Sequence, residues 1–433
     1  MVARSLHHSA SARRTNLTGF VAAALCVGLV GSAEAQDAER GLALLTSKVL
    51  VAAEGGPSAI NHATVLVRGG KIQAVGKRDE VQIPTEYEIL DLGDLWLAPG
   101  LIDLHSHVGG SRRDINDMVF QTNPGLRVSP TVIPANNMLD RAVGAGVTTI
   151  LYIPGSGTNI GGQGVLMKTG LETYEDAVVR DPGSLKIAQG DNPTRWGFGM
   201  GRITMAWNLK NQIRRGIAYA KDWIAYERDG GTQPQRDINL DVFRDLVARK
   251  TQVSTHTQYY HLVLTTIIML ARDFGFATYI DHGSFDSYLA APLAIEHGVA
   301  AILGPREVMY PRPPRFDTDG RVIGSAWGFQ QAGHQQIGFN TDAPVVPQEE
   351  LQLQAAMGVR YGMDTTHMES VRGLTIVPAV VAGIEDTVGS IEAGKDADLI
   401  VVTGDPVDPR TSVEMVFIRG RKIYDTREER RRW

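Results

Sequence analysis

The chain has 433 residues, with 43 basic and 48 acidic side chains and a formal net charge of −5. This mildly acidic balance gives no reason to expect nucleic-acid binding. Cys26 is the one cysteine of the sequence, which excludes a disulfide framework and any metal site built from several thiolates. The length allows a large buried core and predicts more than one structural unit.

Residues 1–35 have the pattern of an export signal. Basic residues precede an apolar stretch at 17–30, and Ala33-Glu34-Ala35 has the small-x-small pattern that a signal peptidase accepts. We expect cleavage near Ala35 and a periplasmic or secreted mature protein, with Arg13-Arg14 leaving a twin-arginine route open beside the general one. The apolar stretch is shorter than the roughly 20 residues of a spanning helix. We therefore expect no stable membrane anchor, with an uncleaved anchor as the alternative.

Both ends of the mature chain contain short β-branched runs that glycine turns separate. The runs lie at residues 48–51, 63–68, 71–75, 398–402, 415–419 and 420–424. Such runs are too short to form separate domains, but they can pair with one another. We predict one small β-sandwich domain assembled from residues 36–98 and 386–433.

Between these ends, from residue 99 to residue 385, short apolar runs alternate with helical stretches. The strand candidates lie at residues 101–107, 147–153, 164–168, 185–189, 252–256, 277–282, 300–303 and 336–341. Helical patterns occupy residues 209–228, 242–250 and 262–274. This alternation is typical of βα units with parallel strands. Because a (β/α)8 barrel needs about 250 residues, we predict an α/β fold with a TIM-like barrel, and an open doubly wound sheet is the alternative.

Side chains that can bind a metal follow several of these strand candidates. His105 and His107 are two residues apart on the first, so their rings point to the same face. His256, His282 and Asp342 each lie where an apolar run meets a polar loop, which is the end of a strand where barrel active sites lie. Their spacings of 26 and 60 residues match one and two βα units of about 30 residues. We expect all five at one mouth, with ordinary polar strand ends as the alternative.

Three motifs resemble the amidohydrolase superfamily. Residues 98–108, APGLIDLHSHV, look like its first barrel strand, and residues 340–344, NTDAP, look like its eighth. Residues 388–400, VGSIEAGKDADLI, are similar to the segment that leads back into the small domain. The resemblance covers nearly all of the mature chain and is closest to the exported, imidazolonepropionase-like branch.

The resemblance implies a metal centre. His105, His107, His256 and His282 would bind a divalent ion, with Zn²⁺ as the expected metal in one or two copies, and Asp342 would be ligand and proton shuttle. A divalent ion lowers the pKa of bound water to roughly 7. Asp342 would then take the proton from the attacking hydroxide and return it to the leaving nitrogen.

The number of ions depends on the fourth strand. Residues 185–190, LKIAQG, resemble the segment of peptidase-like members in which a carboxylated lysine bridges two metals, so Lys186 is the candidate bridge. A carbamate supplies two hard oxygens, whereas a free ammonium would repel the metals. The alternative is a Lys186 that reaches from the strand end or contacts a neighbouring carboxylate. Gln189 and Asp191 are the fallback ligands.

These features together predict a metal-dependent amidohydrolase. The expected reaction is hydrolysis of a carbon–nitrogen bond in an amide, a cyclic amide or a small peptide, rather than in a large protein. Phosphoester or lactone hydrolysis at the same site is one alternative. A non-enzymatic periplasmic binding protein on a degenerate barrel is the other. The expected partner is a small-molecule amide or peptide, and a homo-oligomer is left open.

Overall fold

The computed structural model describes residues 41–433, except residues 56, 191, 197–199, 306–307 and 310–322. The predicted export signal lies outside the described residues, so its cleavage and the localisation of the protein stay predictions. Among the described helices, none combines the length and the hydropathy that crossing a membrane requires.

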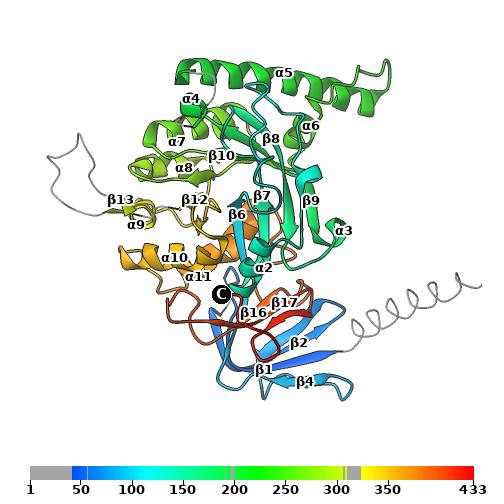
Figure 1. Ribbon diagram of the computed structural model, residues 1–433, viewed down its shortest axis with the longest axis vertical. Coiled ribbons are helices and arrows are strands. Elements are labelled where there is room, and N and C mark those ends of the chain that lie inside the picture. The colour runs from blue at the N-terminus through cyan, green and yellow to red at the C-terminus, as the bar shows by residue number, and fades with distance from the viewer. Residues whose placement is uncertain (1–40, 56, 191, 197–199, 306–307, 310–322) are drawn as a thin grey trace, which may run out of the picture.

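Eight strands from the two ends of the chain form one sheet (Figure 1). They are β1 (Leu42–Leu50), β2 (Ala59–Arg68), β3 (Lys71–Lys77), β4 (Glu88–Asp91), β5 (Trp96–Pro99), β16 (Leu399–Val402), β17 (Val413–Ile418) and β18 (Arg421–Asp425). Strand β5 joins the two halves, because it pairs parallel with β1 and antiparallel with β16. Gly69 and Gly70 both have positive φ, which the tight turn between β2 and β3 requires. The small domain is thus a composite of both termini.

Eight further strands form the barrel. They are β6 (Leu101–Ser106), β7 (Val147–Tyr152), β8 (Ile160–Lys168), β9 (Val178–Ala188), β10 (Gln252–His256), β11 (Ile280–His282), β12 (Ala301–Leu303) and β15 (Ile337–Phe339). The first five and the last three form separate hydrogen-bonded sheets. Parallel bridges close the ring, Val253 to Thr278 and Thr257 to His282 on one side, and Ser106 to Ala343 on the other. This closure confirms the predicted α/β barrel and excludes the open sheet.

Strand β8 corrects the prediction of eight parallel strands. It pairs antiparallel with both of its neighbours, β7 and β9. Only residues 153–159 separate β7 from β8, and a parallel crossover needs a dozen residues or more. The chain therefore returns as a hairpin. The apolar run predicted the strand, but its direction depends on this short glycine-containing connection.

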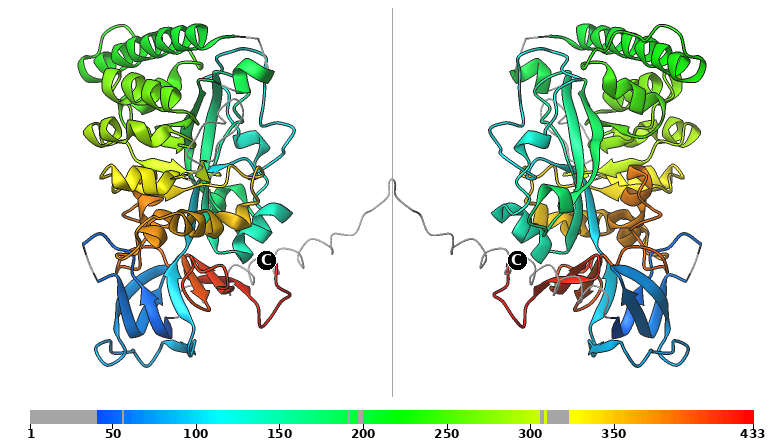
Figure 2. Two further views of the ribbon diagram at one scale, coloured as in Figure 1. Left: turned by 90° about the vertical axis from the view of Figure 1, so that its left-hand side faces the viewer. Right: turned by 90° about the vertical axis from the view of Figure 1, so that its right-hand side faces the viewer.

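Helices cover the outside of the barrel, and Figure 2 shows most of them stacked along one side of its strands. The α-helices are α2 (Asn137–Gly144), α3 (Tyr174–Ala177), α4 (Asn192–Trp196), α5 (Arg202–Asp229), α6 (Asp241–Val247), α7 (Tyr260–Thr266), α8 (Ala291–Glu296), α9 (Ser325–Gln331), α10 (Leu351–Arg360), α11 (Glu369–Leu374) and α12 (Ile376–Ala382). A π-helical segment, Ile267–Asp273, continues α7. Short 3-10 turns lie at η1 (Ser129–Thr131), η3 (Ser287–Ala290) and η4 (Gln348–Glu350), and a two-residue ladder joins β13 (Val308–Met309) to β14 (Ile323–Gly324). The predicted stretch 209–228 falls within α5, whereas the stretches 242–250 and 262–274 overlap α6 and the α7 segment but run past their C-terminal ends.

A buried ion pair fastens the small domain to the barrel. Lys168, the last residue of β8, donates from Nζ to Oδ2 of Asp398, and both side chains are almost fully buried. The other oxygen of Asp398 accepts a hydrogen bond from the backbone N–H of Arg419, 2.9 Å away. Asp398 therefore joins the barrel edge to the strand turn between β17 and β18.

Lys168→Met is expected to destabilise the protein by about 3–5 kcal/mol, because it leaves the Asp398 carboxylate buried without its cation. The double variant Lys168→Met/Asp398→Asn removes the charge as well and is expected to recover part of that loss. Urea unfolding of the metal-loaded protein measures both. Equal losses in the single and double variants would contradict a role for the buried charge.

Candidate metal centre

The first two histidines lie at the end of β6, and both are buried. Each ring is held from its Nδ1 side: His105 Nδ1 lies 2.7 Å from Asp281 Oδ2, and His107 Nδ1 lies 2.8 Å from the carbonyl oxygen of Ile153. Because these oxygens accept, Nδ1 of each ring carries the hydrogen. In the neutral rings Nε2 then keeps its lone pair, which is the arrangement of a metal-binding histidine.

The other two histidines come from β10 and β11. His282 Nδ1 donates to the carbonyl oxygen of Gly304 at 2.9 Å, and its Nε2 faces His256 Nδ1 at 2.8 Å. The remaining nitrogen of His256, Nε2, is buried and has no hydrogen-bond partner among the described residues. Two buried rings are thus turned toward each other, and one of them keeps a polar atom that the protein leaves unsatisfied. An unsatisfied buried polar atom is costly unless a ligand or water completes it.

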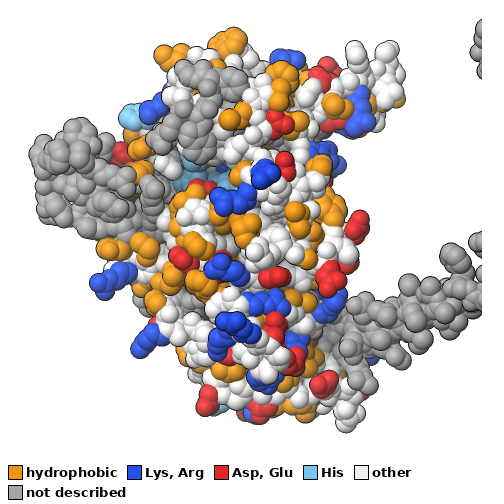
Figure 3. Space-filling model, in the orientation of Figure 1, with side chains coloured by type: hydrophobic (Ala, Val, Ile, Leu, Met, Phe, Trp, Pro, Cys, Tyr) orange, Lys and Arg blue, Asp and Glu red, His pale blue; other side chains and the backbone are white. Residues whose placement is uncertain are grey.

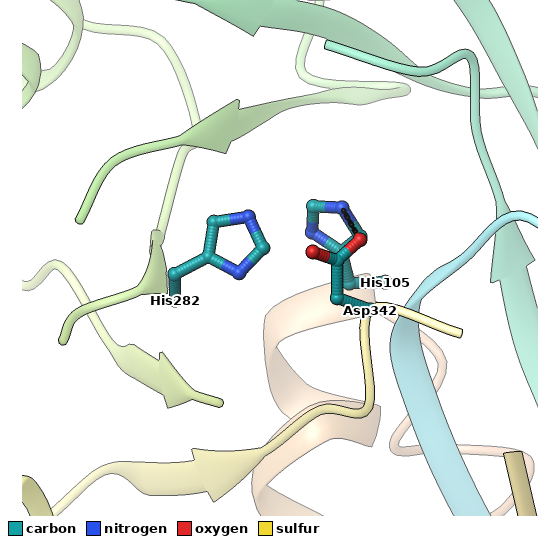
Figure 4. Close-up of side chains that lie close together, drawn as sticks. All are labelled: His105, His282 and Asp342. Atoms are coloured by element: carbon teal, nitrogen blue, oxygen red, sulfur yellow. Dashed lines mark ion pairs between the residues drawn. The ribbon is translucent and has the colours of Figure 1, made fainter. Parts of the chain in front are cut away.

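Asp342, just beyond β15, completes the cluster. Its Oδ1 lies 3.3 Å from His105 Nε2 and 3.2 Å from His107 Nε2. The ligand atoms of His105, His282 and Asp342 lie within 4.8 Å of one another, and Figure 4 shows the three side chains converging. Atoms that share one Zn²⁺ at about 2.0–2.2 Å lie roughly 3–4 Å apart.

The chemistry of this donor set fits a divalent cation. His107 Nε2 and the Asp342 carboxylate both offer electron pairs to the same point, and a cation between them would remove their repulsion. Imidazole nitrogen and carboxylate oxygen are ligands that Zn²⁺ accepts.

Burial sets the charge states of these groups. It lowers the pKa of His105 to about 3, helped by the Lys186 cation, and that of His282 to about 4. The rings are therefore neutral at pH 7, the form that binds a metal. Burial alone would raise the pKa of Asp342, but the neighbouring His105 and His107 side chains hold it well below its usual value. Asp342 is ionised.

The backbone at two of these residues is strained. His282 has φ +75° and Asp342 has φ +48°, in the left-handed region that non-glycine residues rarely adopt. Such conformations persist where the surroundings impose them, and they gather at functional sites. The strain at His282 also breaks the regular alternation of β11.

Lys186, on β9, points into the same centre. Its side chain is fully buried, with Nζ 3.2 Å from His105 Nε2 and 3.4 Å from the carbonyl oxygen of Thr255. Burial lowers the pKa of Lys186 to about 8. The alternative in which it reaches out from the strand end is therefore wrong. Of the fallback ligands, Gln189 donates to Thr266 Oγ1 at 2.6 Å, away from the centre, and Asp191 lies outside the described residues.

Two buried carboxylates near the centre were not anticipated from the sequence. Asp281 orients His105, and Asp103 accepts hydrogen bonds from the backbone of His105 and from Thr341. Burial raises the pKa of each to about 7. Asp103 was readable from the sequence, because it stands two residues before His105 on the same face of the strand. Asp281 was not, because alternation assigns it and His282 to opposite faces.

The site is open on one face of the molecule. Figure 3 shows histidine and acidic side chains at the bottom of a hollow, with Lys or Arg side chains on its rim. A closed α/β barrel with histidines and an aspartate at the carboxyl ends of its strands is the architecture of a metal-dependent hydrolase.

Comparison with known proteins agrees with this class. A model of the amidohydrolase family matches residues 330–423. The chain is 25% identical to an imidazolonepropionase of Deinococcus radiodurans, over 82% of this chain and 88% of that protein. It is 24% identical to amidohydrolase tasK of Hapsidospora irregularis over 83% of this chain, but it spans only 40% of the length of that larger protein.

Solved structures give the same result. An amidohydrolase from Thermotoga maritima superposes with a TM-score of 0.77 at 28% identity, covering 89% of this chain and all of the other. A putative prolidase from Bifidobacterium longum, with a TM-score of 0.54 at 19% identity over 89% and 95% of the two chains, shares the fold. The chain is similar to amidohydrolases in sequence and fold and to imidazolonepropionases in sequence, and these relatives support a hydrolase that acts on carbon–nitrogen bonds.

Proposed function

We propose that the protein hydrolyses a carbon–nitrogen bond in an amide, a cyclic amide or a small peptide with a bound divalent metal, Zn²⁺ in the first instance. The proposed metal-binding residues are His105, His107, Lys186, His256, His282 and Asp342. One observation carries the proposal: an ionised Asp342 oxygen and the Nε2 atoms of His105 and His107 meet within 3.3 Å. Two named relatives support the bond type, since imidazolonepropionase and prolidase both denote enzymes of this chemistry.

When bound, the divalent ion would supply an electrophile for the scissile carbonyl and an activated water at neutral pH. The chain's own residues divide the remaining work. The hydrogen bonds to Asp281, to Ile153 O and to Gly304 O fix the rings of His105, His107 and His282. They keep Nε2 of each ring directed to the centre.

Asp342 is proposed as the general acid/base. Its carboxylate is ionised and can accept the proton of the attacking water, then deliver it to the departing nitrogen. Delivery matters most for a carbon–nitrogen bond, because an amine leaves poorly until it is protonated. This requirement favours amide over ester or phosphoester substrates for a site built around a proton shuttle.

We further propose that Lys186 carries a carbamate. Its lowered pKa leaves part of the buried amine neutral near pH 8, and the neutral nitrogen attacks the carbon of CO2, forms a C–N bond and releases one proton. The product is an anion where the free side chain would be a cation. It would supply two oxygens beside His105 and so allow two ions to bind.

Removal of the metal is expected to abolish turnover. Dialysis against a chelator should leave a folded, inactive protein, because the neutral histidines and Asp342 would then hold no metal ion to polarise the scissile carbonyl. Added Zn²⁺ should restore activity with one or two equivalents bound, as measured by elemental analysis. A metal-free preparation that retains full turnover would overturn the proposed function.

A further inference from the structure

We propose that Asp103 is a positioning residue for the proton shuttle: its carboxylate fixes Asp342 relative to the His105–His107 pair. This inference rests on the proposed function. Asp103 lies on β6, two residues before His105, and is fully buried. Its hydrogen bonds go to the backbone of His105 and to Thr341 and Gln348, and so its influence on the side chains that converge on the centre runs through the backbone.

One carboxylate receives four hydrogen-bond donors. Oδ1 accepts from the backbone N–H of His105 at 2.9 Å. Oδ2 accepts from the backbone N–H of Thr341 at 3.1 Å, from Thr341 Oγ1 at 2.6 Å and from Gln348 Nε2 at 2.5 Å. A carboxylate has about four lone-pair positions, so Asp103 accepts about as many hydrogen bonds as it can, three of them at Oδ2.

These donors come from three segments that meet where the barrel closes. His105 belongs to β6, Thr341 follows β15, and Gln348 opens the η4 turn that leads into α10. The first and last barrel strands share no regular ladder here. Their direct backbone contacts are the bridge from Ser106 to Ala343 and the hydrogen bond from His107 N to Ala343 O at 2.8 Å. Asp103 supplies a second link between β6 and the segment after β15. It acts through Thr341, which precedes Asp342, whereas the contacts of Ala343 follow it.

Asp342 thus lies between two tethered residues. Thr341 is held by Asp103, and Ala343 is held by His107 and by the Thr341 hydroxyl, whose oxygen accepts from Ala343 N at 3.1 Å. The tethers impose the φ of +48° on Asp342. Without them the strained residue would relax and move its carboxylate, and a misplacement of about 1 Å can cost about 100-fold in rate.

Asp103→Asn tests this directly. Whichever way the amide is turned, its NH2 group faces a donor, either His105 N–H or the three donors at the Oδ2 position. We expect kcat to fall at least about 10-fold, with KM and bound metal changed less than about twofold. The solvent deuterium isotope effect on kcat should rise, because proton transfer becomes slower relative to the other steps.

A matched pair of variants keeps the test independent of the folding of Asp103→Asn. Thr341→Val removes one donor to Asp103 at nearly constant volume, whereas Thr341→Ser keeps the hydroxyl. Thr341→Val should show an intermediate loss of kcat and Thr341→Ser should be close to wild type. Loss of activity in proportion to lost metal, or unchanged kcat in Asp103→Asn, would overturn the role of Asp103.

The substrate for these assays is the compound that metal-loaded wild type turns over best in a panel of N-acyl amino acids, cyclic amides and dipeptides. A wild type that hydrolyses none of them overturns the proposed function and this inference with it. An active wild type whose kcat and isotope effect match those of Asp103→Asn overturns this inference only.

Discussion

Asp342→Asn is expected to keep its metal and its fold and to lose turnover by about 100-fold or more, the typical contribution of a general acid/base. Asparagine has nearly the same shape and tolerates the left-handed backbone that Asp342 adopts, so the change isolates the ionisable oxygen. An amide can contact the metal and the nearby rings, but it cannot carry a proton from water to the leaving nitrogen. Elemental analysis and steady-state kinetics on the same preparation measure the two effects separately.

Asp286→Asn is a suitable control for that experiment. Asp286 lies just beyond β11 and accepts a hydrogen bond from Tyr260 N at 3.1 Å, which an asparagine oxygen can also accept. The substitution Asp286→Asn removes one carboxylate from the loop after β11 and changes no residue of the metal centre, so turnover should stay within about twofold of wild type. Turnover of Asp342→Asn equal to that of this control would remove Asp342 from the mechanism.

The barrel and the side chains that converge at its mouth could be predicted from the sequence, because both depend on local patterns of apolar and polar residues. An apolar run that ends in a polar residue marks the carboxyl end of a strand, and a parallel ring carries all such ends to one mouth. His256 and His282 follow this rule, and they face each other at 2.8 Å. The alternation of side chains along a strand also places Asp103 and His105 on one face of β6.

Other features depend on information that a run of residues does not hold. The direction of β8 follows from the length of its connection to β7, not from its apolar character. The approach of Asp281 to His105 depends on the left-handed backbone of His282, which reverses the expected face. The burial of Lys186 depends on the neighbouring strands that close around it. Each of these is a tertiary effect.

Lys186→Gln is the second variant with a large expected effect. It removes the proposed carbamate and is expected to cut turnover by at least about 100-fold, since even partners of metal ligands are worth 10- to 100-fold. One of two bound metals should be lost with it. A short carboxylic acid such as formate or acetate should restore part of the activity, because its two oxygens can occupy the space that the carbamate leaves.

The carbamate itself can be observed in the wild type. Incubation with 13C-labelled bicarbonate should give a carbamate carbon signal that is absent from Lys186→Gln. Its formation should be faster above pH 8 than below, because the neutral amine is the reacting form and the pKa of Lys186 is about 8. Lys168 is the internal control: it is also buried, but its Nζ is paired with Asp398, so Lys168→Met should leave the signal unchanged. A fully active wild type with one metal and no carbamate signal would show that Lys186 is unmodified. Its ammonium beside His105 would then leave room for a single metal ion only.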